Sequence, residues 1–319
     1  MAILMSTQER PTERRDAPAA YASHAQATRD HTASFPEDAS RTAGVVRGLL
    51  RIRDWVVRHV GATIASIFML GVIIGVCRPS WFTSYGPSDT APAERLQPPS
   101  AQHIFGTDRL GRDLFSRVLH GGGATIGASV LALSIAVIAG LLIGVVAGYS
   151  GGATDTVLMR FVDVWLAIPG LLLAITIVTA IGFGTTPVAI AIGIGITPAF
   201  VRTTRSQVLS IKASPYIEAA TAGGSSFWRI ILTHVLPNSL GPVSVMALLD
   251  FGGVIMGVAT LSFLGFGAKP PAPEWGSLIN DGRDYLMTAP WISLLPGLVV
   301  VLTVLSINIL GRALKKEAT

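Results

Sequence analysis

The sequence predicts an all-α membrane protein with six transmembrane helices. Half of its 319 residues are apolar and only 13% are charged, which is about half the charged fraction of an ordinary soluble domain. Several runs without Asp, Glu, Lys or Arg reach the roughly 18 residues that a helix needs to cross the hydrocarbon layer. Polar segments rich in proline, glycine or basic residues separate these runs. This pattern excludes a soluble globular domain.

The first 59 residues precede any such run. Residues 1–44 combine Ala, Ser, Thr and Pro with mixed charge, and we expect a disordered cytoplasmic tail. They contain no hydrophobic segment of the signal-peptide type, so we expect no cleavage there. Residues 45–59 alternate apolar and basic side chains at helical spacing, which is typical of a short helix lying on the inner membrane surface.

The uncharged runs give six spans. The expected spans are, in order, Val60–Cys77, residues 124–148, two spans within 164–201 joined by a turn at 182–187, residues 240–263 and residues 290–310. The chain is therefore divided into the tail 1–44, a segment 45–121 with the interfacial helix, first span and outer loop, a five-helix core domain 122–311, and a cytoplasmic C-terminus 312–319.

Small residues and prolines indicate how the spans pack. Gly140, Gly144 and Gly148 recur at every fourth residue, so they share one helix face and let a second helix approach closely. Gly253 and Gly257 repeat this spacing in the fifth span. Prolines within or beside spans are expected to bend them or loosen their hydrogen bonding. These prolines are Pro169, Pro198 and Pro296.

Basic residues favour one orientation in the membrane. Arginines are concentrated before the first span, and more basic residues surround the polar segment 214–238, whereas loop 264–289 carries more acidic than basic residues. The positive-inside rule then places both termini and segment 214–238 in the cytoplasm. We expect a multi-pass protein of the inner (cytoplasmic) cell membrane, in contact with lipid.

Residues 214–238 predict a helical hairpin between two spans, and we call this segment the hairpin. Ser214 is a good N-cap and Pro215 suits the first helical position. The first helix is about two turns long and should end at Gly223-Gly224, with Gly224 at positive φ. A second helix, capped by Ser225 or Ser226, is expected to run to the residues just before Pro237. Such a short first helix is marginal alone and needs a packing partner.

The hairpin resembles a known loop. Glu218-Ala219-Ala220, then Gly224, then Leu236-Pro237 are similar to the EAA loop of ABC-importer membrane subunits, although His234 stands where the general pattern has Ile. The resemblance implies a coupling helix that docks into a cleft of a separate ATPase subunit. The alternative is a hairpin that only ties two spans together. The residues expected to carry the coupling are Pro215, Tyr216, Glu218, Ala219, Ala220 and Gly224.

Residues 45–312 resemble more narrowly the C-type permease of dipeptide and oligopeptide ABC importers. The segment from His103 to Arg117 is similar to the family's FGTDxxGRDxxSR motif, and Met159-Arg-Phe-Val-Asp163 resembles its MRxVD motif. Leu261-Ser-Phe-Leu-Gly265 and Trp275-Gly276 match its last outer loop. One departure concerns the pathway lining, because the family commonly has an acidic residue at the position of Val258.

This resemblance implies a type I ABC-importer permease fold and a set of partners. Two six-helix subunits, this chain and a B-type permease, would enclose the pathway. Two ATPase subunits or a fused ATPase would lie beneath them, and an extracytoplasmic binding protein would deliver a peptide substrate. Within the same family, nickel, haem or glutathione are alternative cargoes.

Several classes of site are missing from the sequence. It has no GxxxxGK[ST] phosphate loop, so ATP and Mg are expected on the ATPase subunits and no cofactor on this chain. The single cysteine, Cys77, excludes a thiolate metal site and is expected to be buried. The spans also lack a paired acid and base, His-rich metal spacing and a nucleophile motif, so we expect no enzyme. The basic residues form no nucleic-acid stripe, and we expect no nucleic-acid partner.

Asp250 is the one acidic residue inside an otherwise uncharged span. Such a group is costly in lipid and normally faces the bundle interior, a partner or water. It is therefore a candidate for the transport pathway, with a structural hydrogen bond or a place near the membrane surface as the alternative. A different class, an ion-coupled secondary carrier, would use Asp250 as its proton or cation site.

Overall fold

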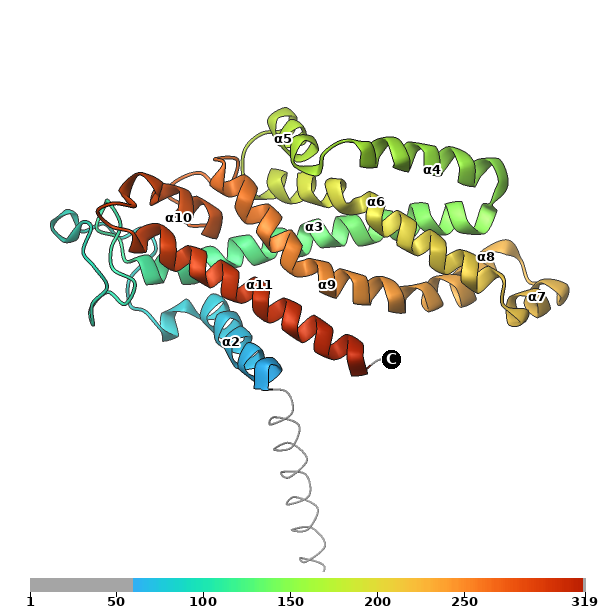
Figure 1. Cartoon of the computed structure of the whole chain (residues 1–319), viewed down its shortest axis with the longest axis horizontal. Helices are drawn as coiled ribbons and strands as arrows, with labels where there is room; N and C mark the ends of the chain where they lie inside the picture. The colour runs from blue at the N-terminus through green and yellow to red at the C-terminus, as the bar shows by residue number, and fades with distance from the viewer. Residues whose placement is uncertain (1–59, 318–319) are drawn as a thin grey trace, which may run out of the picture. The chain divides into compact units, whose positions relative to one another are not determined.

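The structure is a computed structural model that describes residues 60–317. The expected tail at 1–44 and the expected interfacial helix at 45–59 lie outside the described residues. Every named element of the described part is helical, which confirms the predicted all-α class (Figure 1). The elements are α2 (Val60–Cys77), η1 (Pro79–Trp81), η2 (Pro92–Glu94), α3 (Leu114–Ser150), α4 (Gly152–Ala167), α5 (Gly170–Ile181), α6 (Thr185–Lys212), α7 (Pro215–Ala222), α8 (Phe227–Ile230), η3 (Ile231–Val235), α9 (Leu236–Phe263), α10 (Trp275–Asp281), η4 (Arg283–Tyr285) and α11 (Trp291–Glu317).

The long helices form a bundle with two distinct ends (Figure 1). The end that carries α7 and α8 is called the hairpin end. The opposite end, called the loop end, carries the segment between α2 and α3 and the segment between α9 and α11, which includes α10.

Five helical segments of the described part are each long and apolar enough to cross a membrane. They are α2, α3, α6, the continuous segment Phe227–Phe263 and α11. The second span is longer than expected, because α3 begins at Leu114 rather than near 124. Asp113 caps it, since its carboxylate accepts a hydrogen bond from the Ser116 backbone N–H at 2.7 Å.

The third span begins earlier than residue 164 and bends at Pro169, as predicted for that proline. It is a bent pair, α4 and α5, whose axes differ by 91°. The break falls at Ile168-Pro169, where Ile168 is extended with ψ 124°. A residue before proline avoids the helical region, and proline itself has no N–H to continue the helix, so the chain turns there.

The glycine face of α3 packs against α6, as predicted. Gly140, Gly144 and Gly148 are all buried, and a Cβ atom on Gly148 would come within 2.9 Å of the Val208 Cβ. The two backbones therefore approach closely at each of the three glycines. In the fifth span a Cβ atom on Gly257 would lie 3.2 Å from Ile192 of α6, whereas no atom of the described residues lies within 4 Å of one on Gly253. Its neighbour Gly252 instead packs against Asn308 and Val304 of α11.

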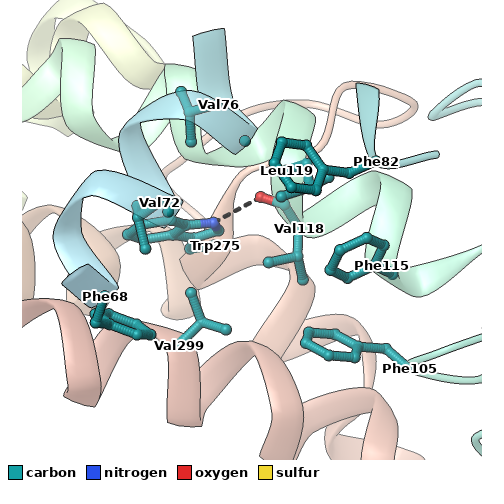
Figure 2. Close-up of a pocket in the computed structure, with 12 residues that line it drawn as sticks. Phe68, Val72, Val76, Phe82, Phe105, Phe115, Val118, Leu119, Trp275 and Val299 are labelled. Carbon is teal, nitrogen blue, oxygen red and sulfur yellow. Dashed lines mark hydrogen bonds between the residues drawn. The ribbon is translucent and has the colours of Figure 1, made fainter. Parts of the chain in front are cut away.

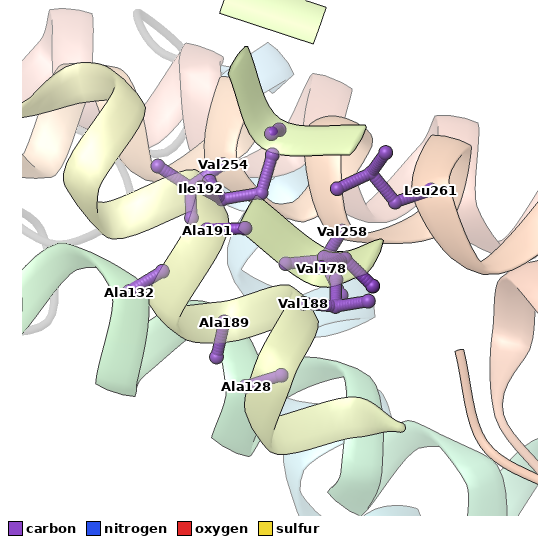
Figure 3. Packing of buried hydrophobic residues seen from close by; sticks show 11 residues of the cluster. Ala128, Ala132, Val178, Val188, Ala189, Ala191, Ile192, Val254, Val258 and Leu261 are labelled. Atoms are coloured by element: carbon purple, nitrogen blue, oxygen red, sulfur yellow. The ribbon is translucent and has the colours of Figure 1, made fainter. Parts of the chain in front are cut away.

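An apolar cluster within the bundle joins α3, α5, α6 and α9 (Figure 3). Val258 is fully buried in it, together with Val178, Val188 and Leu261. The position where the family that this sequence resembles commonly has an acidic residue is thus part of the apolar core. An ionised carboxylate would be costly among these side chains.

Buried polar contacts fasten the loop end together. Glu274 is fully buried, caps α10 through the Gly276 and Ser277 N–H groups, and accepts a hydrogen bond from the Thr125 hydroxyl at 2.8 Å. The indole N–H of Trp275 donates to the Val118 carbonyl oxygen at 2.8 Å (Figure 2). Trp275 also lines an apolar cavity of 280 Å³ between α2, α3 and α11.

Arg117 joins three segments at the same end. Its guanidinium donates to the Pro87 carbonyl oxygen at 3.0 Å and lies 3.9 Å from the Asp281 carboxylate. Burial raises the pKa of Asp281 above its ordinary value, and the positive charge of Arg117 acts in the opposite direction. Cys77, expected to be buried, is exposed because it occupies the last turn of α2.

Candidate functional site: the hairpin and the Asp250 cavity

The first helix of the hairpin is α7, eight residues long, with Pro215 at its start. Ser214 has the extended backbone of an N-cap, φ −83° and ψ 140°, but its side chain does not cap the helix. Its hydroxyl donates instead to the Ser210 carbonyl oxygen at 3.4 Å, because the preceding helix α6 ends only two residues earlier. Ser226 does cap α8, accepting from the Arg229 N–H at 3.4 Å.

Gly224 ends α7 with φ +78°, which confirms the predicted positive φ. The Ser225 N–H donates to the Ala220 carbonyl oxygen at 3.1 Å, and the Gly224 N–H donates to that of Thr221 at 3.0 Å. This is the Schellman pattern, which satisfies the last carbonyl groups of a helix and needs a left-handed residue. A β-branched side chain at this φ would be strained.

The second helix of the hairpin does not end before Pro237, so that prediction is wrong. It continues through a π-helical turn, Ile231–Val235, directly into α9. In that wider turn the Leu236 N–H donates to the Ile231 carbonyl oxygen. Pro237 then falls in the first turn of α9, where its missing N–H is tolerated. As a result the hairpin is continuous with a membrane-spanning helix.

A small apolar cluster holds the hairpin on the ends of α3 and α6. Ile217 is the one buried residue of α7, and it belongs to a cluster with Val145 of α3 and Val208 of α6. The second helix contributes Ile230, Ile231 and Val235 to the same cluster. Burying such side chains is worth roughly 1.5–3 kcal/mol each. The packing partner that a two-turn helix requires is thus supplied by the bundle itself.

The remaining surface of α7 is open. Pro215, Glu218 and Ala219 are exposed, as are Tyr216, at 46%, and Gly224, while Ala220 is half-buried. The ring centroid of Tyr216 lies 6.1 Å from that of His234, the residue that departs from the EAA pattern. The predicted coupling residues therefore share one short exposed element at the hairpin end.

The sequence did not predict a groove beside α7. Glu218, Phe227 and Lys212 line this groove. The Lys212 ammonium group donates to the Tyr149 carbonyl oxygen at 2.7 Å and lies 5.4 Å from the centroid of the Tyr149 ring. Because Tyr149 and Lys212 are far apart in the chain, only the packing of α3 on α6 brings them together.

Two ion pairs fasten α4 to α6 near the hairpin. The Nε and Nη2 groups of Arg205 donate to the two carboxylate oxygens of Asp155, at 2.5 and 2.6 Å. Arg202 contacts Asp163 at 2.6 Å. Asp163 is the acid of the MRxVD segment, so the structure gives that motif a partner on α6.

Asp250 lies half-buried on α9. It lines a cavity of 700 Å³ with polar side chains from three helices. These are Thr203 and Gln207 of α6, Ser244 of α9 and Lys315 of α11. The cavity lies in the half of the bundle nearer the hairpin, since Thr203 and Gln207 belong to the last turns of α6.

Comparison with known proteins decides the family. Residues 140–318 match the model of the binding-protein-dependent transport system inner membrane component. The chain belongs to this family. As a member it is a multi-pass permease component of an ABC transporter in the inner membrane and is not itself an enzyme. Membership implies ATPase and binding-protein partners in general terms, and it favours that class over the secondary carrier.

Three relatives illustrate the family. The dipeptide transport system permease protein DppC of Alkalihalophilus pseudofirmus is 42% identical over 80% of this chain and 83% of its own length. The di/tripeptide permease protein DppC of Pseudomonas aeruginosa is 39% identical over 80% and 86%. The glutathione permease protein GsiD of Pectobacterium atrosepticum is 38% identical over 82% and 87%.

The fold of the family permease agrees with solved ABC importers. A crystal structure of the MetNI methionine ABC transporter in an inward-facing conformation matches with a TM-score of 0.51, at 17% identity, over 63% of this chain and 96% of that one. The predicted ABC-importer permease fold is thereby confirmed.

Proposed function

We propose that this permease carries di- or oligopeptides across the inner membrane, with its hairpin transmitting the work of a separate ATPase. The observation that carries the proposal is the construction of α7. One buried side chain, Ile217, fixes it to the bundle, while Glu218 and Ala219 point away from the cluster and stay exposed. A hairpin that only connected two spans would not need an exposed helix whose C-terminus is capped by the Schellman hydrogen bonds.

The continuity of the hairpin with α9 supports this role. A force on α7 would act on Ile217, on the π-helical turn and then on a helix that reaches the opposite end of the bundle. Alternating access requires two bundle states that bind the ATPase differently. A rigid connection between the docking element and a span provides the physical link between them.

Charges near the hairpin support a cytoplasmic orientation. The Arg202–Asp163 pair is exposed and suits the membrane boundary. From Arg202 to Lys212 helix α6 rises about 15 Å, so α7 would project beyond the lipid to reach an ATPase. Both termini would then lie in the cytoplasm and the loop end outside. ATP and Mg would bind the ATPase subunits, and a B-type permease would complete the pathway.

A peptide cargo agrees with the relatives, whose names state dipeptide, di/tripeptide and glutathione transport. Glutathione is itself a tripeptide, so one pathway chemistry could serve all three. Asp250 would lie on this pathway and offer a carboxylate to a cationic group. Nickel and haem remain the alternative cargoes of the proposal.

Reconstitution tests the proposal. The chain would be assembled with its partner permease, ATPase and binding protein in proteoliposomes, and ATP hydrolysis and uptake of labelled dipeptide would be measured. Dipeptide-loaded binding protein should stimulate both. Stimulation by nickel or haem and not by any peptide would refute the peptide part, and stimulation by glutathione but not by dipeptide would narrow the cargo to that tripeptide. Hydrolysis indifferent to the binding protein would refute the whole proposal.

A further inference from the structure

Residues 108–112 form a tight turn at the loop end. The turn lies within the segment that resembles the FGTDxxGRDxxSR motif, to which the proposed function assigns no role. The Asp108 carboxylate accepts from the backbone N–H groups of Leu110 at 2.8 Å and Arg112 at 3.0 Å. Its other oxygen accepts from the Arg112 Nε at 2.6 Å. Asp108 and Arg112 are 4% and 5% exposed, so a buried, hydrogen-bonded ion pair shapes this turn.

Contacts with the backbone of residues 91–97 also fix the turn. Gly111 has φ +74°, and a Cβ atom there would collide with the Ala91 carbonyl oxygen, so only glycine fits. The Leu96 N–H donates to the Asp108 carbonyl oxygen at 3.1 Å, which aligns residues 95–97 with the base of the turn. The turn is therefore rigid by construction, unlike an ordinary surface loop.

The rigid turn exposes two adjacent side chains, Arg109 and Leu110, to solvent. Arg109 is exposed and Leu110 is 42% exposed. Arg95, on the aligned segment, is exposed as well. Neither arginine side chain forms a hydrogen bond or ion pair with residues 60–317, although Arg112 and Arg117 close by are both paired with Asp108. Two unpaired cations and an apolar side chain make a small, complementary surface for an acidic partner.

The fixed positions of the motif in this turn are buried, whereas its first two open positions are exposed. In FGTDxxGRDxxSR the first two open positions are occupied here by Arg109 and Leu110. The fixed positions around them are the buried Asp108, Gly111 and Arg112.

The turn is connected to the helices that would have to move. Asp113, directly after it, caps α3 through the Ser116 N–H and accepts from the His103 ring at 2.8 Å. The indole N–H of Trp291, the first residue of α11, donates to the Thr107 carbonyl oxygen at 3.4 Å. A displacement of the turn would therefore be transmitted directly to α3 and α11 through these hydrogen bonds.

We propose that the Arg109-Leu110 turn, with Arg95 beside it, is the contact that recognises an acidic patch on the cognate substrate-binding protein. This inference rests on the proposed function, which places the loop end outside the cell. A binding protein fits better than lipid, because the turn lies at the end of the bundle (Figure 1), whereas lipid surrounds its sides.

The test uses the complete transporter in nanodiscs, with ATP hydrolysis measured against the concentration of loaded binding protein. Arg109→Glu combined with Leu110→Asp should raise the half-saturating concentration about tenfold, with basal and maximal rates unchanged, because rim charges govern encounter. Arg109→Lys should stay near the unmodified value, and the Arg109→Glu shift should shrink in high salt. Lys269→Glu, an equal charge reversal on the other loop, is the matched control.

The outcomes separate this inference from the proposed function. If loaded binding protein stimulates the unmodified complex and the double variant equally at every concentration, the turn is not the contact. A shift that follows the content of anionic lipid and not the binding protein would also overturn it. The failure of the proposed function looks different, because then the unmodified complex would itself show no stimulation. Equal thermal midpoints of variant and unmodified complex verify that the framework is intact.

Discussion

Gly144 of α3 and Thr204 of α6 lie so close that a Cβ atom on Gly144 would stand 2.5 Å from the Thr204 Cβ. Atoms of this kind do not approach below about 3 Å without displacing one another. Thr204 is fully buried and has no room to retreat. The contact between the two helices thus depends on the missing side chain.

Gly144→Leu should therefore separate α3 from α6 and lower the yield of assembled complex. Overpacking a tight contact costs about 1–3 kcal/mol, and a leucine at a backbone contact belongs at the upper end. Size-exclusion chromatography and the thermal midpoint of the purified complex measure the effect. Leu141→Ala, on a half-buried position of the same helix, should matter less. Normal assembly and transport by Gly144→Leu would show that the helices need not touch.

Glu274→Ala should destabilise the loop end. The change removes an acceptor that the Thr125 hydroxyl and two N–H groups of α10 share in a fully buried site. Leaving buried donors unpaired costs about 1–3 kcal/mol, so the thermal midpoint of the complex should fall. Asp284→Ala, at a side chain that is 79% exposed, is the control and should leave the midpoint unchanged. An equal midpoint for both variants would mean that water replaces the Glu274 carboxylate.

The orientation can be tested by labelling single cysteines in intact cells. The native Cys77 is exposed, so Cys77→Ser provides the necessary background. A membrane-impermeant maleimide added outside should label Ser100→Cys and Ala272→Cys, in the two segments expected outside, at 88–100 and 270–284. It should not label Ala222→Cys, within 212–228. Labelling of the hairpin from outside would reverse the proposed orientation.

Local signals predicted the elements that local chemistry controls. The charge-free run gave α2 with its observed bounds, and Pro215 with Gly224 gave both ends of α7, because these residues restrict their own backbone. The glycine spacing in α3 predicted a packing face, since small residues leave little alternative use for such a face.

Tertiary packing decided what the sequence could not. Pro237 suggested a helix end, yet a π-helical turn carries the chain past it. Gly252, which the spacing did not select, is the glycine of α9 that contacts α11, because the position of α11 decides which face of α9 is packed. The cavity of Asp250 and the groove beside α7 each combine residues from distant helices, so no local pattern could predict them.

Asp250→Asn separates the two roles of that carboxylate. The substitution keeps the shape of the side chain and removes its charge in a cavity shared with Lys315. If Asp250 lies on the pathway, peptide uptake should fall several-fold while the yield of complex stays unchanged. Uptake normalised to purified complex is the measurement. Ser244→Ala, on the wall of the same cavity, keeps the charge and should be mild. Normal uptake, or a loss of complex alone, would assign Asp250 a structural role.

The hairpin carries the last prediction, on coupling to the ATPase. Gly224→Val should be the most severe change, since no neighbour lies within 4 Å of its Cβ position and the whole penalty comes from φ +78°. Such strain costs about 1–3 kcal/mol, enough to redirect α7. Ala220→Arg should act similarly by placing bulk on the docking surface. Glu218→Ala should remove only the charge-assisted contacts of one carboxylate, typically worth about 1.5–3 kcal/mol when well formed.

All three variants should lower substrate-stimulated ATP hydrolysis, and the first two should also lose ATPase subunits during purification. Thr233→Ala is the control, because Thr233 is exposed on the second helix, outside α7, and should be mild. The order of severity matters as much as the loss. A folded hairpin without Glu218 still presents its shape, whereas one without Gly224 does not. If the three variants hydrolyse ATP at the unmodified rate in response to substrate, the hairpin is a tether and the ATPase acts on this chain elsewhere.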